Sequence, residues 1–292
     1  MLVSKSEKNL LRLAQGQLNS LSLCPRLFQY RHLEQLYSFT NPEQEAKQAL
    51  GSKFHLLMQQ REMGLPIDEI LVDDPQLRSW IEDLSEVAPL IFISNPQVFR
   101  ESEHYRTWQI DEYLLSVIYD LLILTTDQAQ IIDWKTYPEP LSKKRLEDSW
   151  QTRLYLYVLA ETTTYPPEAI SMTYWFFQTG GKPTCATIRY SHTLHEQIKR
   201  ELSRLLTKLS GYLAEFNQQK QFPQLPEGSK LCQSCAFASR CDRVATSADY
   251  VTVDRSPTNS SQEQQYTTSL DPGINAVDSN LLDFDAVEEI AL

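Results

Sequence analysis

The hydrophobic and polar positions in the first half of the chain change from a helical period to a strand-like one. Residues 43–62 place their apolar side chains roughly on one side of a helix, and residues 73–88 predict a second helix. Three β-rich runs follow, at residues 98–104, 112–124 and 130–135. Because only residues 125–128 separate the last two runs, we expect these two strands to pair as an antiparallel hairpin.

The second half of the chain alternates between the same two patterns. Residues 145–162 return to a helical period, and two β-rich runs follow around the turn Gly180-Gly181-Lys182-Pro183, at residues 171–178 and 186–190. A long amphipathic helix then has apolar residues from Ile198 to Phe216 at helical spacing. The order of these elements predicts an α/β fold in which helices flank a mixed, largely antiparallel central sheet.

The end of the chain differs from the rest in composition. From about residue 245 it is polar and carries nine acidic residues against one arginine, a net of −8 out of −11 for the whole chain. We therefore predict a domain over residues 1–244 and an acidic, disordered tail over residues 245–292. Residues 281–290 mix apolar and acidic side chains, which suits either a short interaction segment or an inert solubilising end.

Charge and cysteine content limit the compartment and the partners. No apolar run of about 20 residues is present, and charged residues interrupt the N-terminal leucines, so we expect no membrane span, no signal peptide and a cytoplasmic protein. Thiols stay reduced there, so the five cysteines favour metal or cluster ligation over disulfides. The net charge outside the tail is only −3, which leaves room for a basic groove for nucleic acid. The candidate residues, which could equally form a solvated face, are Lys135, Lys143, Lys144, Arg145 and Arg153.

Two aspartates and a lysine lie on the predicted hairpin. Asp120 lies in its first strand and Asp133 near the end of its second, so both carboxylates can reach one edge of the sheet. Lys135 follows two residues later and therefore shares a face with Asp133. Two adjacent carboxylates suit a hard divalent cation, and a nearby ammonium can assist an attacking water. The arrangement points to phosphodiester hydrolysis, although an Asp-x-Lys triplet on its own also occurs at ordinary exposed strand ends.

The surrounding motifs resemble those of the PD-(D/E)XK nucleases, and of their RecB-like branch in particular. Residues 132–136, Ile-Asp-Trp-Lys-Thr, are similar to the branch motif Ile-Asp-Tyr-Lys-Thr. Residues 51–55 match its Gly-x-x-x-His element, and residues 151–155 match its Gln-x-x-x-Tyr element. The resemblance implies a restriction-endonuclease-like core that binds one or two Mg²⁺ or Mn²⁺ ions.

The resemblance also implies a role for each matching residue. The metal ligands would be His55, Asp120, Asp133 and the Trp134 carbonyl, while Lys135 assists the water and Gln151 and Tyr155 hold the scissile strand or the lysine. A packed core histidine and an ordinary helix surface are the alternatives for His55 and for the Gln-Tyr pair. The branch usually has glycine where this chain has Val117, which could alter how the substrate approaches. Glu101 could be an extra ligand, but we assign it a structural role.

Four of the cysteines form a second possible metal site. Cys232, Cys235 and Cys241 give the spacing C-x2-C-x5-C, and Cys24 lies near the other end of the domain. This layout resembles the [4Fe–4S] site of some RecB-like nucleases, those of the AddB type and CRISPR-associated exonucleases. It implies a structural cluster that joins the N- and C-terminal parts, with Zn²⁺ in the same four ligands as the alternative. Cys185 has no part in this scheme.

The resemblance implies a DNA exonuclease that acts on single-stranded or end-opened DNA in repair, recombination or CRISPR adaptation. No Gly-x-x-x-x-Gly-Lys-Ser/Thr motif is present, so a helicase partner would be a separate protein. Two alternatives remain open at this point. One is a non-catalytic iron–sulfur subunit that binds DNA within a repair complex, and the other is a redox protein whose cluster carries electrons.

Overall fold

The computed structural model describes residues 10–37, 42–93, 95–137, 141–177 and 181–243. The described residues form two compact units, which divide between Pro223 and Gln224. The acidic tail and its segment 281–290 lie outside the described residues. The domain boundary at residue 244 therefore stays a prediction.

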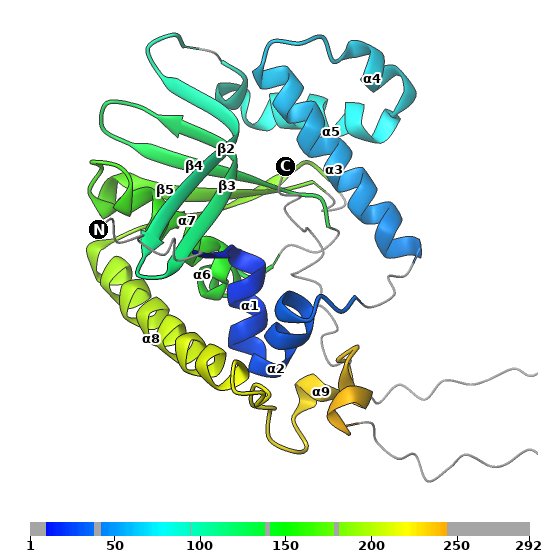
Figure 1. Cartoon of the computed structure of the whole chain (residues 1–292). Helices are drawn as coiled ribbons and strands as arrows, with labels where there is room; N and C mark the ends of the chain where they lie inside the picture. Colours follow the sequence, from blue (N-terminus) through cyan, green and yellow to red (C-terminus); the bar gives the residue numbers. More distant parts are fainter. Residues whose placement is uncertain (1–9, 38–41, 94, 138–140, 178–180, 244–292) are drawn as a thin grey trace, which may run out of the picture. The chain divides into compact units, whose positions relative to one another are not determined.

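The first unit contains a six-stranded mixed sheet (Figure 1). Its strands are β1 (Leu11–Leu13), β2 (Phe99–Ile110), β3 (Tyr113–Leu124), β4 (Ala129–Lys135), β5 (Ile170–Phe176) and β6 (Thr184–Arg189). The order is β1-β3-β4-β5-β6, and β2 pairs with β3. The β1–β3 and β4–β5 pairs are parallel, whereas β2–β3, β3–β4 and β5–β6 are antiparallel. This confirms the predicted fold class.

The longer helices of this unit flank the sheet. They are α1 (Gln15–Leu23), α3 (Pro42–Glu62), α5 (Pro75–Val87), α7 (Trp150–Glu161) and α8 (His192–Phe216). The shorter helical elements are α2 (Pro25–Phe28), η1 (Gln29–Leu33), α4 (Asp68–Asp73), η2 (Pro89–Phe92), α6 (Lys143–Asp148) and η3 (Pro167–Ala169). Among the described residues, no helix has the length and apolar character needed to cross a membrane.

Two hydrophobic clusters hold the helices to the sheet. One joins α1, α7 and α8 to residues such as Tyr119 and Leu122 of β3. The other joins α3 and α5 to Leu121 and to Trp134 of β4. Since Tyr119 and Leu121 would share a face in a regular strand, their separation into different clusters shows that the alternation of β3 is interrupted at Asp120.

The predicted helix over residues 145–162 is two helices in the structure. Ser149 interrupts it in extended conformation, and its side chain accepts a hydrogen bond from the backbone of Thr152. Serine is a favoured residue at this capping position, so α7 begins immediately afterwards. The break fixes the start of α7, and therefore the position of Gln151 in its first turn.

The N-terminal segment contacts the last residues of the first unit. The backbone N–H of Arg26 donates to the Pro223 carbonyl at 3.1 Å, and its Nε donates to the Phe222 carbonyl at 2.8 Å. Phe28 stacks on the ring of Phe222 at 5.9 Å. Within the first unit, these contacts therefore hold together residues that are almost 200 positions apart in the sequence.

The second unit is small in its described part. It contains α9 (Lys230–Gln233) and η4 (Ala238–Cys241). Arg243 pairs with Glu227 at 2.9 Å and donates to the Leu225 carbonyl. These contacts join the last described residue to the start of the second unit.

Candidate active site

The β3–β4 hairpin brings the two predicted aspartates together. Leu121 pairs with Ile132, and the next positions along this register are Asp120 and Asp133. The Asp120 carboxylate also crosses to the neighbouring strand, where its Oδ2 accepts the Trp134 backbone N–H at 2.7 Å. Both aspartates are buried, with 9% and 1% of their surface exposed. The tight turn after β3 is sufficient to produce this register.

Asp133 is held by two side chains. Lys135 Nζ lies 2.7 Å from its Oδ2, and Gln151 Nε2 donates to its Oδ1 at 2.6 Å. Burial raises the pKa of Asp133 to about 6, the charge of Lys135 opposes this shift, and the charge of Asp120 adds to it. Burial would lower the pKa of Lys135, but the charge of Asp133 raises it above its usual value. Lys135 is therefore an ammonium at neutral pH.

His55, on α3, faces the other aspartate. Its Nδ1 lies 3.4 Å from Asp120 Oδ1, and its Nε2 lies 3.1 Å from the Trp134 carbonyl oxygen. Burial would lower the pKa of His55, but the charge of Asp120 and a hydrogen bond to it raise the pKa to about 9. His55 is thus part of the polar site and not an ordinary packed core histidine.

Gly51 explains why this helix can approach the hairpin. A Cβ added at Gly51 would lie 2.8 Å from Thr136 Oγ1, closer than side chains normally pack. Glycine at this position lets α3 pass close to the end of β4. His55 follows one turn later, so the Gly-x-x-x-His spacing places the imidazole at the carboxylates.

Glu103 is a site residue that the sequence analysis missed. Its carboxylate oxygen lies 4.0 Å from His55 Nδ1. One ligand atom each from His55, Glu103 and Asp120 lie within 4.8 Å of one another. The missed signal is the β2–β3 register: with Ser102 opposite Leu121 and His104 opposite Tyr119, Glu103 falls opposite Asp120.

Two other predicted residues have contacts with side chains outside the carboxylate group. Glu101 pairs with His104 at 2.6 Å, and its side chain is 53% exposed, as suits its predicted structural role. Tyr155 is buried in the core, where its ring packs edge-on against Tyr119 at 5.4 Å and its carbonyl accepts the Tyr119 hydroxyl. Gln151 contacts Asp133 directly, and the ring of Tyr155 packs against Tyr119 of β3. Val117 is also fully buried in the core.

The donor set fits a divalent cation. Asp120 and Glu103 offer carboxylate oxygens and His55 a ring nitrogen, all in one small volume. Hard cations prefer carboxylate oxygen, and imidazole suits several transition metals. Without a cation, the site gathers three carboxylates around one imidazole and one ammonium, so a positive ion would relieve their mutual repulsion.

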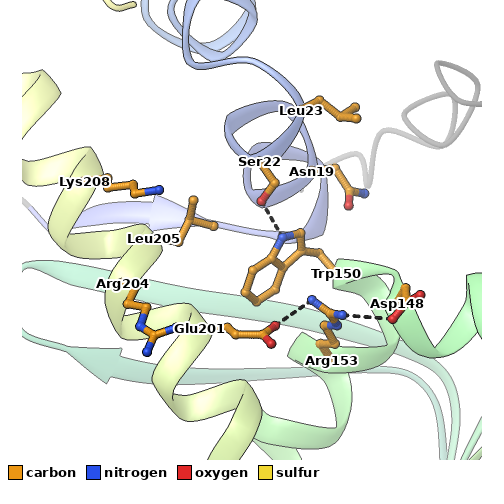
Figure 2. A pocket seen from close by; sticks show the side chains of 10 residues that line it. All are labelled: Asn19, Ser22, Leu23, Asp148, Trp150, Arg153, Glu201, Arg204, Leu205 and Lys208. Atoms are coloured by element: carbon orange, nitrogen blue, oxygen red, sulfur yellow. Dashed lines mark hydrogen bonds and ion pairs between the residues drawn. The ribbon is translucent and has the colours of Figure 1, made fainter. Parts of the chain in front are cut away.

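One of the predicted basic residues, Arg153, borders a pocket beside the start of α7 (Figure 2). The pocket holds about 480 Å³ and is lined by Asn19, Ser22, Leu23, Asp148, Trp150, Arg153, Glu201, Arg204, Leu205 and Lys208. Arg153 pairs with Glu201 at 2.8 Å and with Asp148 at 3.2 Å. Its charge is therefore already compensated, while Arg204 and Lys208 project from α8 along the same pocket.

The four-cysteine set stays a prediction. Cys24 lies between α1 and α2 in the first unit, and Cys232, Cys235 and Cys241 belong to the second unit. All four are partly buried. Cys185 is exposed on β6 opposite Trp175, consistent with its exclusion from the proposed ligand set.

Three comparisons relate the chain to known proteins. The family model described as the PD-(D/E)XK nuclease superfamily matches residues 12–242. A crystal structure from Eubacterium rectale, provisionally named an exonuclease, has a TM-score of 0.44 at 12% identity, covering 77% of this chain and 96% of its own. The crystal structure of SSO0001 has a TM-score of 0.35 at 14% identity, covering 81% of this chain and 87% of its own. No curated protein matches the chain.

Proposed function

Because the chain belongs to the PD-(D/E)XK nuclease superfamily, we propose that it is a Mg²⁺- or Mn²⁺-dependent deoxyribonuclease that degrades single-stranded or end-opened DNA from its ends. The observation that carries the proposal is the group of charged atoms on the β3–β4 hairpin. Asp120 and Asp133 meet across it, Lys135 contacts one of them at 2.7 Å, and His55 contacts the other at 3.4 Å.

The metal ligands would be Asp120, Asp133, His55 and the Trp134 carbonyl. When bound, a divalent cation supplies Lewis-acid activation of the phosphate and a more acidic water. The carbonyl oxygen of Trp134 has two lone pairs, so its contact with His55 leaves one available for a ligand.

The remaining polar residues would orient the reactants. Lys135 is a poor proton acceptor, because its pKa is raised beside Asp133. As an ammonium it can orient the attacking water and offset charge that develops on the phosphate. Gln151 fixes the rotamer of Asp133 through its 2.6 Å hydrogen bond. Tyr155 would act indirectly, by supporting the helix that carries Gln151.

The substrate class follows from what such a site recognises. Its groups address phosphates and no base edge, so cleavage would be independent of sequence. Single-stranded DNA, or a duplex end opened into single strands, is the substrate that we propose. RecB-like membership and a place in repair, recombination or CRISPR adaptation are part of this proposal, as is a helicase on a separate polypeptide.

A [4Fe–4S] cluster in Cys24, Cys232, Cys235 and Cys241 is a further part of the proposal, with Zn²⁺ as the alternative occupant. Chain length supports it. The Arg26 amide donates a hydrogen bond to the Pro223 carbonyl, and only eight residues lie between Pro223 and Cys232. An extended chain spans about 3.5 Å per residue, so the segment is long enough to return to Cys24.

The test is a nuclease assay on anaerobically purified protein, with iron and sulfide measured on the same sample. We expect Mn²⁺-dependent release of nucleotides from end-labelled single-stranded DNA by the wild type, and none by Asp133→Ala or Lys135→Ala. Asp127→Ala, in the exposed β3–β4 turn, is the matched control and should keep full activity. Binding of DNA without cleavage by the wild type would refute the proposal and favour the non-catalytic subunit.

A further inference from the structure

We propose that Glu103 is a direct ligand of the divalent cation, together with Asp120 and the Nδ1 atom of His55. This inference rests on the proposed function and adds a carboxylate from β2 to a site whose sequence motifs lie on α3, β3 and β4. It rests on the orientation of His55, the backbone of Glu103 and the hydrogen bonds of Asp133.

The orientation of His55 follows from its contact with the hairpin. The Trp134 carbonyl can only accept a hydrogen bond, and His55 Nε2 lies 3.1 Å from it, so Nε2 carries the proton. In the neutral imidazole the lone pair is then on Nδ1. A metal-binding histidine commonly donates its other N–H to a backbone carbonyl, which fixes the ring. Nδ1 faces Asp120 and Glu103, at 3.4 and 4.0 Å.

The backbone of Glu103 departs from the strand around it. The β2–β3 register pairs Ser102 with Leu121 and His104 with Tyr119, and the backbone is irregular at Glu103 between them. Its φ is 51°, in the left-handed region that glutamate rarely adopts. The strand is regular on both sides, so the departure is local to the position that faces the first aspartate. Its side chain is about one-third exposed, so a cation from solvent can reach it.

The hydrogen bonds of Asp133 separate its role from that of Glu103. Lys135 contacts one carboxylate oxygen of Asp133 and Gln151 donates to the other. Asp120 has one oxygen on the Trp134 amide and its second directed at His55. One oxygen each of Asp120 and Glu103 therefore lies in one small volume with the His55 nitrogen, whereas both oxygens of Asp133 contact Lys135 or Gln151.

The test measures Mn²⁺ binding to the full-length protein by calorimetry and by electron paramagnetic resonance, without DNA. Glu103→Gln has nearly the same shape as the wild type, and we expect it to bind Mn²⁺ at least about 10-fold more weakly. Glu101→Gln, two residues away on the same strand, is the matched control and should bind within about twofold of the wild type. Thermal unfolding without metal verifies that each variant is folded.

Glu103→Asp distinguishes a ligand from a charge. It keeps the charge but withdraws the carboxylate by one methylene, so a ligand role predicts weaker binding and a purely electrostatic role predicts wild-type affinity. If Glu103→Gln or Glu103→Asp binds Mn²⁺ as tightly as a wild type that cleaves DNA, the inference is wrong and the proposed function stands. If the wild type neither binds Mn²⁺ nor cleaves, both are wrong.

Discussion

Gly51→Ala tests whether α3 approaches the hairpin as closely as the structure indicates. The added Cβ would lie 2.8 Å from Thr136 Oγ1, about 0.6 Å inside an ordinary contact that begins at 3.4 Å. Overpacking of this kind costs about 1–3 kcal/mol. Alanine recovers about 1 kcal/mol because it favours the helix more than glycine does. The expected net effect is a decrease of about 0–2 kcal/mol in the free energy of unfolding.

Gly211→Ala is the matched control for this prediction. Gly211 lies within α8, and a Cβ there would meet no atom within 4 Å, so the substitution should stabilise the protein by about 0.5–1 kcal/mol. Chemical denaturation of both variants, without divalent ions, isolates the clash as the difference. Activity is a second measure, because relief of the clash moves His55 away from Asp120, and misplacement by about 1 Å can reduce the rate about 100-fold. Equal stabilisation by both variants, with full activity retained, would refute the close approach.

Three further predictions concern other parts of the site. Gln151→Ala removes a hydrogen bond to the buried carboxylate of Asp133, so the pKa of Asp133 should rise further above about 6. The acidic limb of the pH–rate profile should then move to higher pH, and an unchanged limb would contradict this prediction. The pKa of His55 is raised to about 9, so without metal its ion pair with Asp120 stabilises the fold fully below pH 6.5 and is lost as the pH rises through about 9. Denaturant titrations should therefore show that His55→Gln destabilises the protein less and less over that pH range. Cys24→Ala should lose the bound iron or zinc that Cys185→Ala keeps, as metal analysis of the purified proteins would show.

The main features of the fold and half of the site could be predicted because they depend on local signals. The four-residue connection after β3 sets the register that pairs Leu121 with Ile132, next to Asp120 and Asp133, and a period of two puts Lys135 beside the second aspartate. The i, i+4 spacing within α3 brings His55 to the site once Gly51 permits the approach. Each of these relations lies within one element or one tight turn, where the sequence pattern determines the geometry.

The remaining features depend on pairings between distant segments. β1 pairs in parallel with the start of β3, about 100 residues away, and its three residues carry no periodic signal of their own. Glu103 was missed for a related reason: its position depends on the β2–β3 register, and its left-handed backbone violates the alternation on which strand prediction relies. The Ser149 cap of α7, by contrast, is a local signal that the sequence analysis did not use.

Glu101 and Glu103 show how little separates an inert acid from a candidate ligand. Regular alternation would put both side chains on one face of β2, yet Glu101 pairs with His104 and Glu103 turns toward His55. A left-handed glutamate within a strand costs stability, of the order of 1–3 kcal/mol, and a third carboxylate near two buried ones adds repulsion. A bound divalent cation offsets both, since it stabilises the folded state in proportion to the logarithm of its concentration over its dissociation constant.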